Sequence, residues 1–248
     1  MKIALIIEYD GTRYHGSQIQ DNVPTIQGEL EKSIFMLTGE KTRTYFAGRT
    51  DHGVHARGQV VAFKTLSPLY GDMLVRALNH YLPRDIVVRD AFIVSDDFDP
   101  RRNAVRREYR YYIWNDVYQS PLHRLNTFHV RRPLNIDMMK QACGLVVGTH
   151  DYISFAGSLD GRKSTIRTVF SADVAREGPV CIFSIIANSF LTRQVRNTVG
   201  TLIRIGSGKM DVDSFKALFV NKKPSSAGPT APPHGLYLMK IEYASGLQ

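Results

Sequence analysis

The sequence contains little cysteine and no long apolar run. Its 248 residues include two cysteines, Cys143 and Cys181, each inside an apolar periodic segment. Two cysteines are too few for a zinc site made of several thiolates or for a disulfide framework, so we expect two buried thiols. No stretch approaches the roughly 20 consecutive apolar residues of a membrane span, and residues 1–7 show no signal-peptide pattern. We therefore expect a cytoplasmic protein with no membrane segment.

Positive charge is in excess over the whole chain. The sequence has 32 Lys and Arg against 23 Asp and Glu, which gives a formal net charge of +9. This excess favours a polyanionic partner, nucleic acid first, although a basic balance can also serve solubility alone. With 43% hydrophobic residues, the chain is long enough for one large domain or two small ones with cores of their own.

The hydrophobic pattern predicts two successive β-α-β-β-α-β units. In the first half we expect strands at residues 3–9, 42–47, 58–64 and 86–94, and helices at 26–38 and 73–81. In the second half we expect strands at residues 109–114, 165–174, 180–187 and 236–243, and helices at 136–147, 190–205 and 212–220. The prediction is an α+β fold of two ferredoxin-like halves, residues 1–100 and 101–248, each with an open sheet face suited to RNA.

Residues 46–56 pack more ionisable and glycine residues between two β-leaning runs than any other segment. Asp51 lies between Gly48 and Gly53, which permit a left-handed turn and close backbone approach. Arg49 can favour the anionic form of the Asp51 carboxyl, which could then act as a nucleophile, a base or a metal ligand. Alternatively, Asp51 only hydrogen bonds within its own turn.

A second segment, residues 101–110, is rich in arginine. Guanidinium groups bind phosphate oxygens in pairs, which suits them to fixing a nucleic-acid backbone in one register. Aromatic side chains that alternate along the adjoining strand favour stacking on bases. A solvated charge run is the alternative. The arginines are Arg101, Arg102, Arg106, Arg107 and Arg110, with Glu108 the only acid among them, and the aromatic residues are Tyr109, Tyr111 and Trp114.

Two further segments offer candidate contacts. The long polar loop at residues 12–22 presents charge, stacking surface and hydrogen-bonding groups, so it could contact RNA or form a mobile surface excursion. These residues are Arg13, Tyr14, His15 and Gln18. The helix expected at 190–205 places Arg196 beside its apolar stripe. A partly buried arginine there requires a carboxylate partner.

Residues 47–55, read as Ala-Gly-Arg-Thr-Asp-x-Gly-Val-His, resemble the signature of the TruA family of tRNA pseudouridine synthases. The resemblance implies that Asp51 is the catalytic nucleophile. His52 departs from the family, which usually has alanine there, and Ser17 stands where a tryptophan is often found. His52 is expected to change the geometry and the pH response around Asp51. Ser17 is expected to remove one stacking contact.

Two other segments extend the resemblance over nearly the whole chain. Residues 107–111 are similar to a second family motif, which implies that Tyr109 stacks on the target uracil and assists proton removal. Arg101, in Phe98-Asp99-Pro100-Arg101, corresponds to a family arginine, which implies that it enters the active site. Residues 195–200 are similar to a third motif, which implies that Arg196 pairs with Asp51. The implied architecture joins the two halves into one mainly antiparallel sheet, with helices on one side and the active cleft between the halves.

The resemblance implies an enzyme that isomerises uridines 38, 39 and 40 in the anticodon stem-loop of tRNA, as a homodimer and without cofactor or metal. Attack by Asp51 on C6 of the base or on C1′ of the ribose remains open. One alternative is a metal-dependent nuclease or hydrolase that uses Asp51, His52 and His55 with His150 and Asp151. Another is an RNA-binding protein without catalysis. The expected substrate-binding residues are Arg49, Arg101, Arg102, Arg106, Arg107, Tyr109 and Arg110.

Overall fold

The computed structural model describes residues 1–158 and 164–247. They form two compact units, one made of residues 1–107 with the residues from 237 onward and the other of residues 108–236. This division differs from 1–100 and 101–248 because most of strand β10 (Leu236–Tyr243) belongs to the first unit. There it pairs in parallel with β3 (His55–Lys64), where Tyr237 lies opposite His55.

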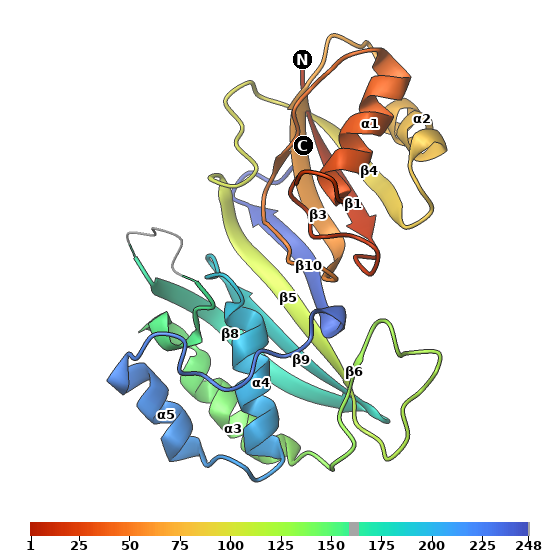
Figure 1. The fold of residues 1–248 in the computed structure, drawn as a ribbon. Helices are drawn as coiled ribbons and strands as arrows, with labels where there is room; N and C mark the ends of the chain where they lie inside the picture. The colour runs from red at the N-terminus through yellow and green to blue at the C-terminus, as the bar shows by residue number, and fades with distance from the viewer. Residues whose placement is uncertain (159–163, 248) are drawn as a thin grey trace. The chain divides into compact units, whose positions relative to one another are not determined.

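The first unit has a ferredoxin-like arrangement. In chain order it contains β1 (Lys2–Tyr9), α1 (Ile26–Thr38), β2 (Tyr45–Phe46), β3, α2 (Gly71–Tyr81) and β4 (Ile86–Val94). Strand β1 lies antiparallel between β3 and β4, and β2 and β10 both pair with β3. Helices α1 and α2 contact each other beside this part of the sheet (Figure 1).

Helix α1 shows why the sequence pattern predicts this unit well. The hydroxyl of Thr25 accepts a hydrogen bond from the first turn, and Gly39 ends the helix with φ at +74°. Ile26, Leu30 and Ile34 are fully buried, and their spacing of four places them along one face.

The second unit repeats the alternation of strands and helices. It contains most of β5 (Ala104–Trp114), followed by β6 (Phe128–His129), α3 (Ile136–Val146), β7 (Gly148–Asp151), β8 (Ile166–Glu177), β9 (Val180–Ala187), α4 (Gln194–Gly206) and α5 (Val212–Asn221). Short 3-10 helices cover Ile153–Phe155 and Pro233–Gly235. The strand order is β5-β9-β8-β7, with β6 beside β5. Helix α3 contacts α4, α5 and β8 (Figure 1).

The predicted α+β class is confirmed: the described residues form five α-helices and a mostly antiparallel sheet of ten strands. The cleft between the halves stays a prediction. None of the helices in the described part of the chain has the length and apolar character required to cross a membrane. Cys143 and Cys181 are buried free thiols, as predicted, and burial raises the pKa of Cys143 to about 12.

Several element boundaries differ from prediction for local reasons. Strand β2 has two residues because part of the backbone at 42–47 bonds elsewhere; the Thr44 amide, for example, donates to the Glu31 carboxylate at 2.8 Å. Helix α4 begins at Gln194, since Arg193 has φ at +59° and cannot continue a right-handed helix backward. Strand β5 begins at Ala104, five residues early. The short strands β6 and β7 carried no recognisable pattern.

Candidate active site

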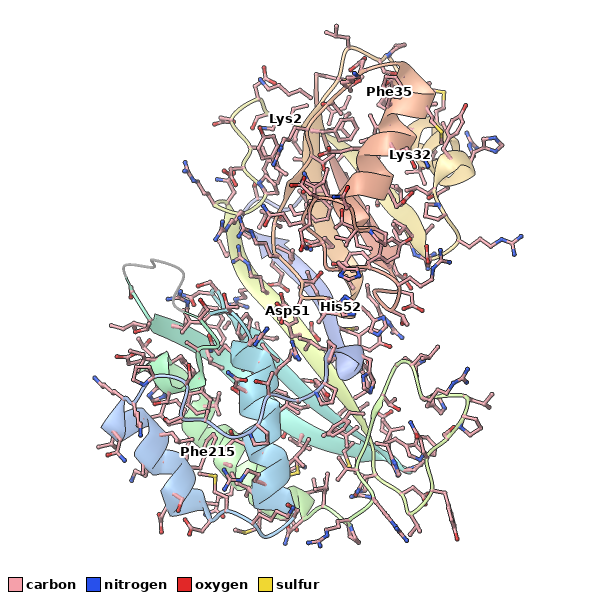
Figure 2. All side chains as sticks on the ribbon, viewed as in Figure 1. Lys2, Lys32, Phe35, Asp51, His52 and Phe215 are labelled. Carbon is pink, nitrogen blue, oxygen red and sulfur yellow. The ribbon has the colours of Figure 1, made fainter. Side chains whose placement is uncertain are left out.

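Asp51 lies on a tight turn before β3, where Figure 2 labels it together with His52. The Val54 amide donates to the Asp51 carbonyl at 3.1 Å, which closes the turn. Gly53 adopts φ at +73°, so the left-handed conformation predicted for the glycine after Asp51 is confirmed. The Asp51 side chain is half-buried. A carboxylate on a short, closed turn is held in a narrow range of positions.

The polar loop at residues 11–22 supports this turn from one side. Its Gly16 has φ at +98°, and a Cβ atom there would lie 2.7 Å from the Thr50 carbonyl oxygen. A Cβ atom at Gly11 would lie 2.0 Å from the Val54 carbonyl oxygen. Only glycine permits these two approaches, because any side chain would collide with fixed backbone.

The same loop places its predicted RNA contacts in different environments. Arg13 and His15 are exposed. Tyr14 is buried, and its hydroxyl donates a 2.5 Å hydrogen bond to the Asp85 carboxylate. Burial and the neighbouring Asp85 raise the pKa of the Tyr14 phenol. Tyr14 is therefore part of the core, and the expectation that it stacks on RNA is corrected.

The two histidines of the motif have different environments. His55 begins β3 and is buried, with its Nδ1 atom 3.1 Å from both the Gly11 amide and an Asp10 carboxylate oxygen. Its ring also stacks on Tyr237, with centroids 4.6 Å apart. His52 is exposed and meets the His15 ring edge to face at 4.6 Å. His55 therefore has a structural position, whereas His52 lies at the surface.

The hydrolase alternative required these histidines to share a metal with Asp51. In the second unit, the His150 Nε2 atom lies 2.9 Å from the Val147 carbonyl oxygen, and Asp151 accepts from the Thr165 hydroxyl. Within residues 1–158 and 164–247, no three His, Cys, Asp or Glu side chains gather closely enough to hold a metal ion. His55, His150 and Asp151 instead have partners close to them.

The arginine-rich stretch divides into exposed and buried members. Arg101, Arg102 and Arg106 are exposed, as is Arg49 on the Asp51 turn. Arg107 is buried, and its guanidinium donates to the carbonyl oxygens of Arg101 at 2.7 Å, Ala104 at 3.3 Å and Ala47 at 3.5 Å. Arg110 is half-buried and pairs with Glu108 at 2.9 Å. The exposed members suit contact with phosphate better than Arg107 does.

Tyr109 and Tyr111 point to the buried side of β5. The Tyr109 ring meets Phe190 edge to face, with centroids 5.2 Å apart. Tyr111 is fully buried and its hydroxyl donates to the Pro232 carbonyl oxygen at 2.7 Å. Tyr111 therefore belongs to the core.

Arg196 projects from the first turn of α4 in the second unit and is half-buried, as the stripe pattern predicted. Its Nε atom donates to the Ala231 carbonyl oxygen at 2.8 Å, and the Ala231 amide donates back to the Arg196 carbonyl at 3.1 Å. Gly200 allows this close packing, because a Cβ atom there would lie 1.7 Å from the Pro229 carbonyl oxygen. The pairing of Arg196 with Asp51 stays a prediction.

Sequence reasoning overlooked one buried polar residue near Asp51. Gln59 lies within β3 and is fully buried, and its carboxamide bonds to Gly48 at the start of the turn. A polar side chain inside the otherwise apolar run at residues 58–64 was the available signal, since buried amides require partners.

Comparison with known proteins connects both units to one family. A family model described as tRNA pseudouridine synthase matches residues 5–101 and 142–244. The chain is 42% identical over 241 residues to tRNA pseudouridine synthase A of Acetivibrio thermocellus, covering 97% of this chain and 99% of that protein. The protein of the same name from Thermoanaerobacter sp. (strain X514) is 44% identical, and the match covers 97% of this chain and 99% of that protein. The one from Geotalea uraniireducens is 43% identical, and the match covers 98% of this chain and 99% of that protein. The chain therefore belongs to the TruA family of tRNA pseudouridine synthases.

Proposed function

We propose that the protein is an isomerase that converts uridine to pseudouridine in tRNA, at positions 38, 39 and 40 of the anticodon stem-loop. The observation that carries this proposal is the family match across both units, with the motif aspartate Asp51 on a closed turn. The net charge of +9 and the exposed Arg49, Arg101, Arg102 and Arg106 suit a polyanionic substrate.

The reaction breaks the bond between N1 of uracil and C1′ of the ribose, turns the base and joins C5 to C1′. The target nucleotide must first leave the base stack, which costs a few kcal/mol. In this proposal the Asp51 carboxylate attacks either C6 or C1′, and no cofactor takes part. Either route leaves a proton on C5 that must be removed after the new bond forms.

Two residues of the second unit complete the proposed chemistry. Arg196 keeps Asp51 ionised and oriented, as the third motif implies. Tyr109 covers the uracil and assists removal of the C5 proton, as the second motif implies. Its position on β5, with its ring braced by Phe190, supports a fixed stacking surface.

We assign the arginines different parts according to their burial. The exposed Arg49, Arg101, Arg102 and Arg106 contact the tRNA backbone. Arg110 is half-buried and ion-paired with Glu108, and it contributes to substrate binding from that fixed position. Arg107 holds the backbone around Ala47 and Arg101 in place. A homodimer, as the family resemblance implies, would extend the basic surface beyond one chain and grip the stem-loop at a distance from Asp51.

The decisive experiment compares the parent protein with Asp51→Asn. Asparagine keeps the size and turn-forming ability of aspartate but lacks the attacking anion, so tRNA affinity is expected to persist while pseudouridine formation is lost. A turn residue would tolerate the exchange. Each protein is assayed with and without a chelator, because a metal ligand would make the parent dependent on divalent ions. Turnover by Asp51→Asn above a trace, or loss of parent activity on chelation, refutes the nucleophile assignment.

A further inference from the structure

The backbone that leads into Asp51 is fixed at alternate residues by buried polar side chains. Gly48 and Thr50 flank the exposed Arg49, and both backbone polar groups of each are hydrogen bonded. We propose that Gln59 and Ser17 are positioning residues for Asp51, acting through Gly48 and Thr50; this inference rests on the proposed function.

Gln59 closes a ring of two hydrogen bonds with Gly48. Its Nε2 atom donates to the Gly48 carbonyl oxygen at 2.7 Å, and its Oε1 atom accepts from the Gly48 amide at 3.2 Å. Gln59 is fully buried in the interior of β3. Two bonds from one planar group fix both the position and the tilt of the Gly48 backbone.

Ser17 forms the corresponding ring with Thr50. The Thr50 amide donates to the Ser17 Oγ atom at 2.9 Å, and the Ser17 amide donates to the Thr50 carbonyl at 3.1 Å. Ser17 is 1% exposed, so water does not compete for these bonds. The residue that departs from the family pattern therefore contacts the residue immediately before the proposed nucleophile.

Tyr9 connects the two rings. Its hydroxyl shares a 2.8 Å hydrogen bond with the Thr50 Oγ1 atom and also bonds the Gln59 side chain. Tyr9, Ser17 and Gln59 come from β1, the 11–22 loop and β3, so three separate segments restrain one turn. Such a supporting shell limits the positions of a reacting group, and a displacement of about 1 Å can lower a rate about 100-fold.

The same unit contains a matched control for Gln59. Asn79 of α2 closes an equivalent ring with Val88 of β4, with its Nδ2 atom 2.9 Å from the Val88 carbonyl oxygen and the Val88 amide 2.7 Å from its Oδ1 atom. Gln59→Met and Asn79→Leu each remove two hydrogen bonds between a side chain and the backbone. The backbone that Gln59→Met releases leads into the Asp51 turn, whereas the backbone that Asn79→Leu releases does not. Gln59→Met also removes the bond to the Tyr9 hydroxyl, and Gln59 is more deeply buried than Asn79.

The test measures thermal melting, tRNA affinity, kcat and KM for both variants. We expect both melting temperatures to fall, but only Gln59→Met to lower kcat, by about 10- to 100-fold, with KM and tRNA affinity nearly unchanged. A kcat for Gln59→Met equal to that of Asn79→Leu overturns the proposal. Loss of folded enzyme alone also lowers the apparent kcat at unchanged KM, so kcat is expressed per folded molecule, with the folded fraction taken from the melts. A purely structural role then leaves this corrected kcat at the parent value.

A second pair covers the case in which Gln59→Met does not fold. Ser17→Ala removes the acceptor of the Thr50 amide, and Ser33→Ala removes an equally buried hydroxyl from α1. The proposal then requires that Ser17→Ala lower kcat and that Ser33→Ala leave it unchanged. Equal kcat values in these two variants refute the proposal. A parent protein that forms no pseudouridine refutes the proposed function itself, whereas an active parent with unaffected variants refutes the positioning role only.

Discussion

The guanidinium of Arg107 donates a hydrogen bond of 2.7 Å to the carbonyl oxygen of Arg101, so two arginines of one basic stretch have different environments. Arg101 is exposed, whereas Arg107 is 8% exposed. Alternation along β5 accounts for the burial of Arg107, because residues two apart face the same side of a strand. The arginines of this stretch therefore have two roles: Arg107 stabilises the fold, whereas Arg101 presents its charge at the surface.

This division predicts that two arginine substitutions will affect stability to different extents. Arg107→Met keeps an apolar stem but leaves one buried and two part-buried carbonyl oxygens without their donor, so the free energy of unfolding should fall by about 1–3 kcal/mol. Arg102→Met removes an exposed side chain and should change it by less than about 0.5 kcal/mol. Urea unfolding of the two variants and the parent measures the difference. Equal stability of the two variants would contradict the assignment of Arg107 to the fold.

Binding of tRNA should weaken steeply with salt. Each arginine that contacts a phosphate releases counterions, so its removal should reduce the slope of log affinity against log salt by roughly 0.7–0.9. Arg102→Ala and Arg106→Ala are the informative variants, since their ion pairs to Asp99 at 3.7 Å and Glu242 at 3.9 Å are exposed and weak. The measurement is tRNA affinity over a range of salt. Slopes identical to the parent's in both variants would remove these arginines from the phosphate contact.

Arg196→Ala should lower both stability and turnover. Loss of its hydrogen bond to the Ala231 carbonyl oxygen leaves an acceptor unpaired in a half-buried region, at a cost of about 1–3 kcal/mol. Loss of the proposed countercharge to Asp51 should reduce turnover further. Arg196→Lys retains the charge but not the planar fork, so we expect partial stability with poor activity. Thermal melts and assays check this, and parent-like values for Arg196→Ala would exclude the role.

Alkaline pH should destabilise the first unit through Tyr9. Burial raises the pKa of the Tyr9 phenol from 10.0 to about 12, so the folded state holds this proton more tightly than the unfolded state. The resulting stability, about 3 kcal/mol, is fully present below pH 10 and is lost as pH rises through 12. Tyr9→Phe lacks this titration, so its stability should fall less steeply over that range. Parallel pH profiles of the two proteins in chemical unfolding would contradict the assignment.

Periodic elements and local turn chemistry were predictable from sequence. Helix α1 has an apolar repeat of four residues between Thr25 and Gly39, and its bounds agree with the prediction. The Asp51 turn was predictable because Gly53 supplies the left-handed conformation. These features depend on neighbours within a few residues, which a sequence displays directly.

Contacts between distant segments were not predictable in the same way. The burial of Arg107 depends partly on the Ala47 carbonyl, 60 residues earlier. The burial of Tyr14 depends on Asp85, 71 residues later. Polar residues at both positions follow the pattern of surface residues, and only the fold reveals that each has a buried partner.

The order of synthesis has a consequence for the Asp51 turn. Strand β10 pairs Tyr237 and Leu238 with His55 and Ala56, a few residues after Asp51. Residues 108–236, which form the second unit, leave the ribosome before most of β10. The second unit can therefore fold first, although domains usually mature from the N-terminus. This edge of β3 stays unpaired by β10 until residues 237 onward have been made, so the proposed catalytic turn receives the support of β10 only after the whole second unit has been synthesised.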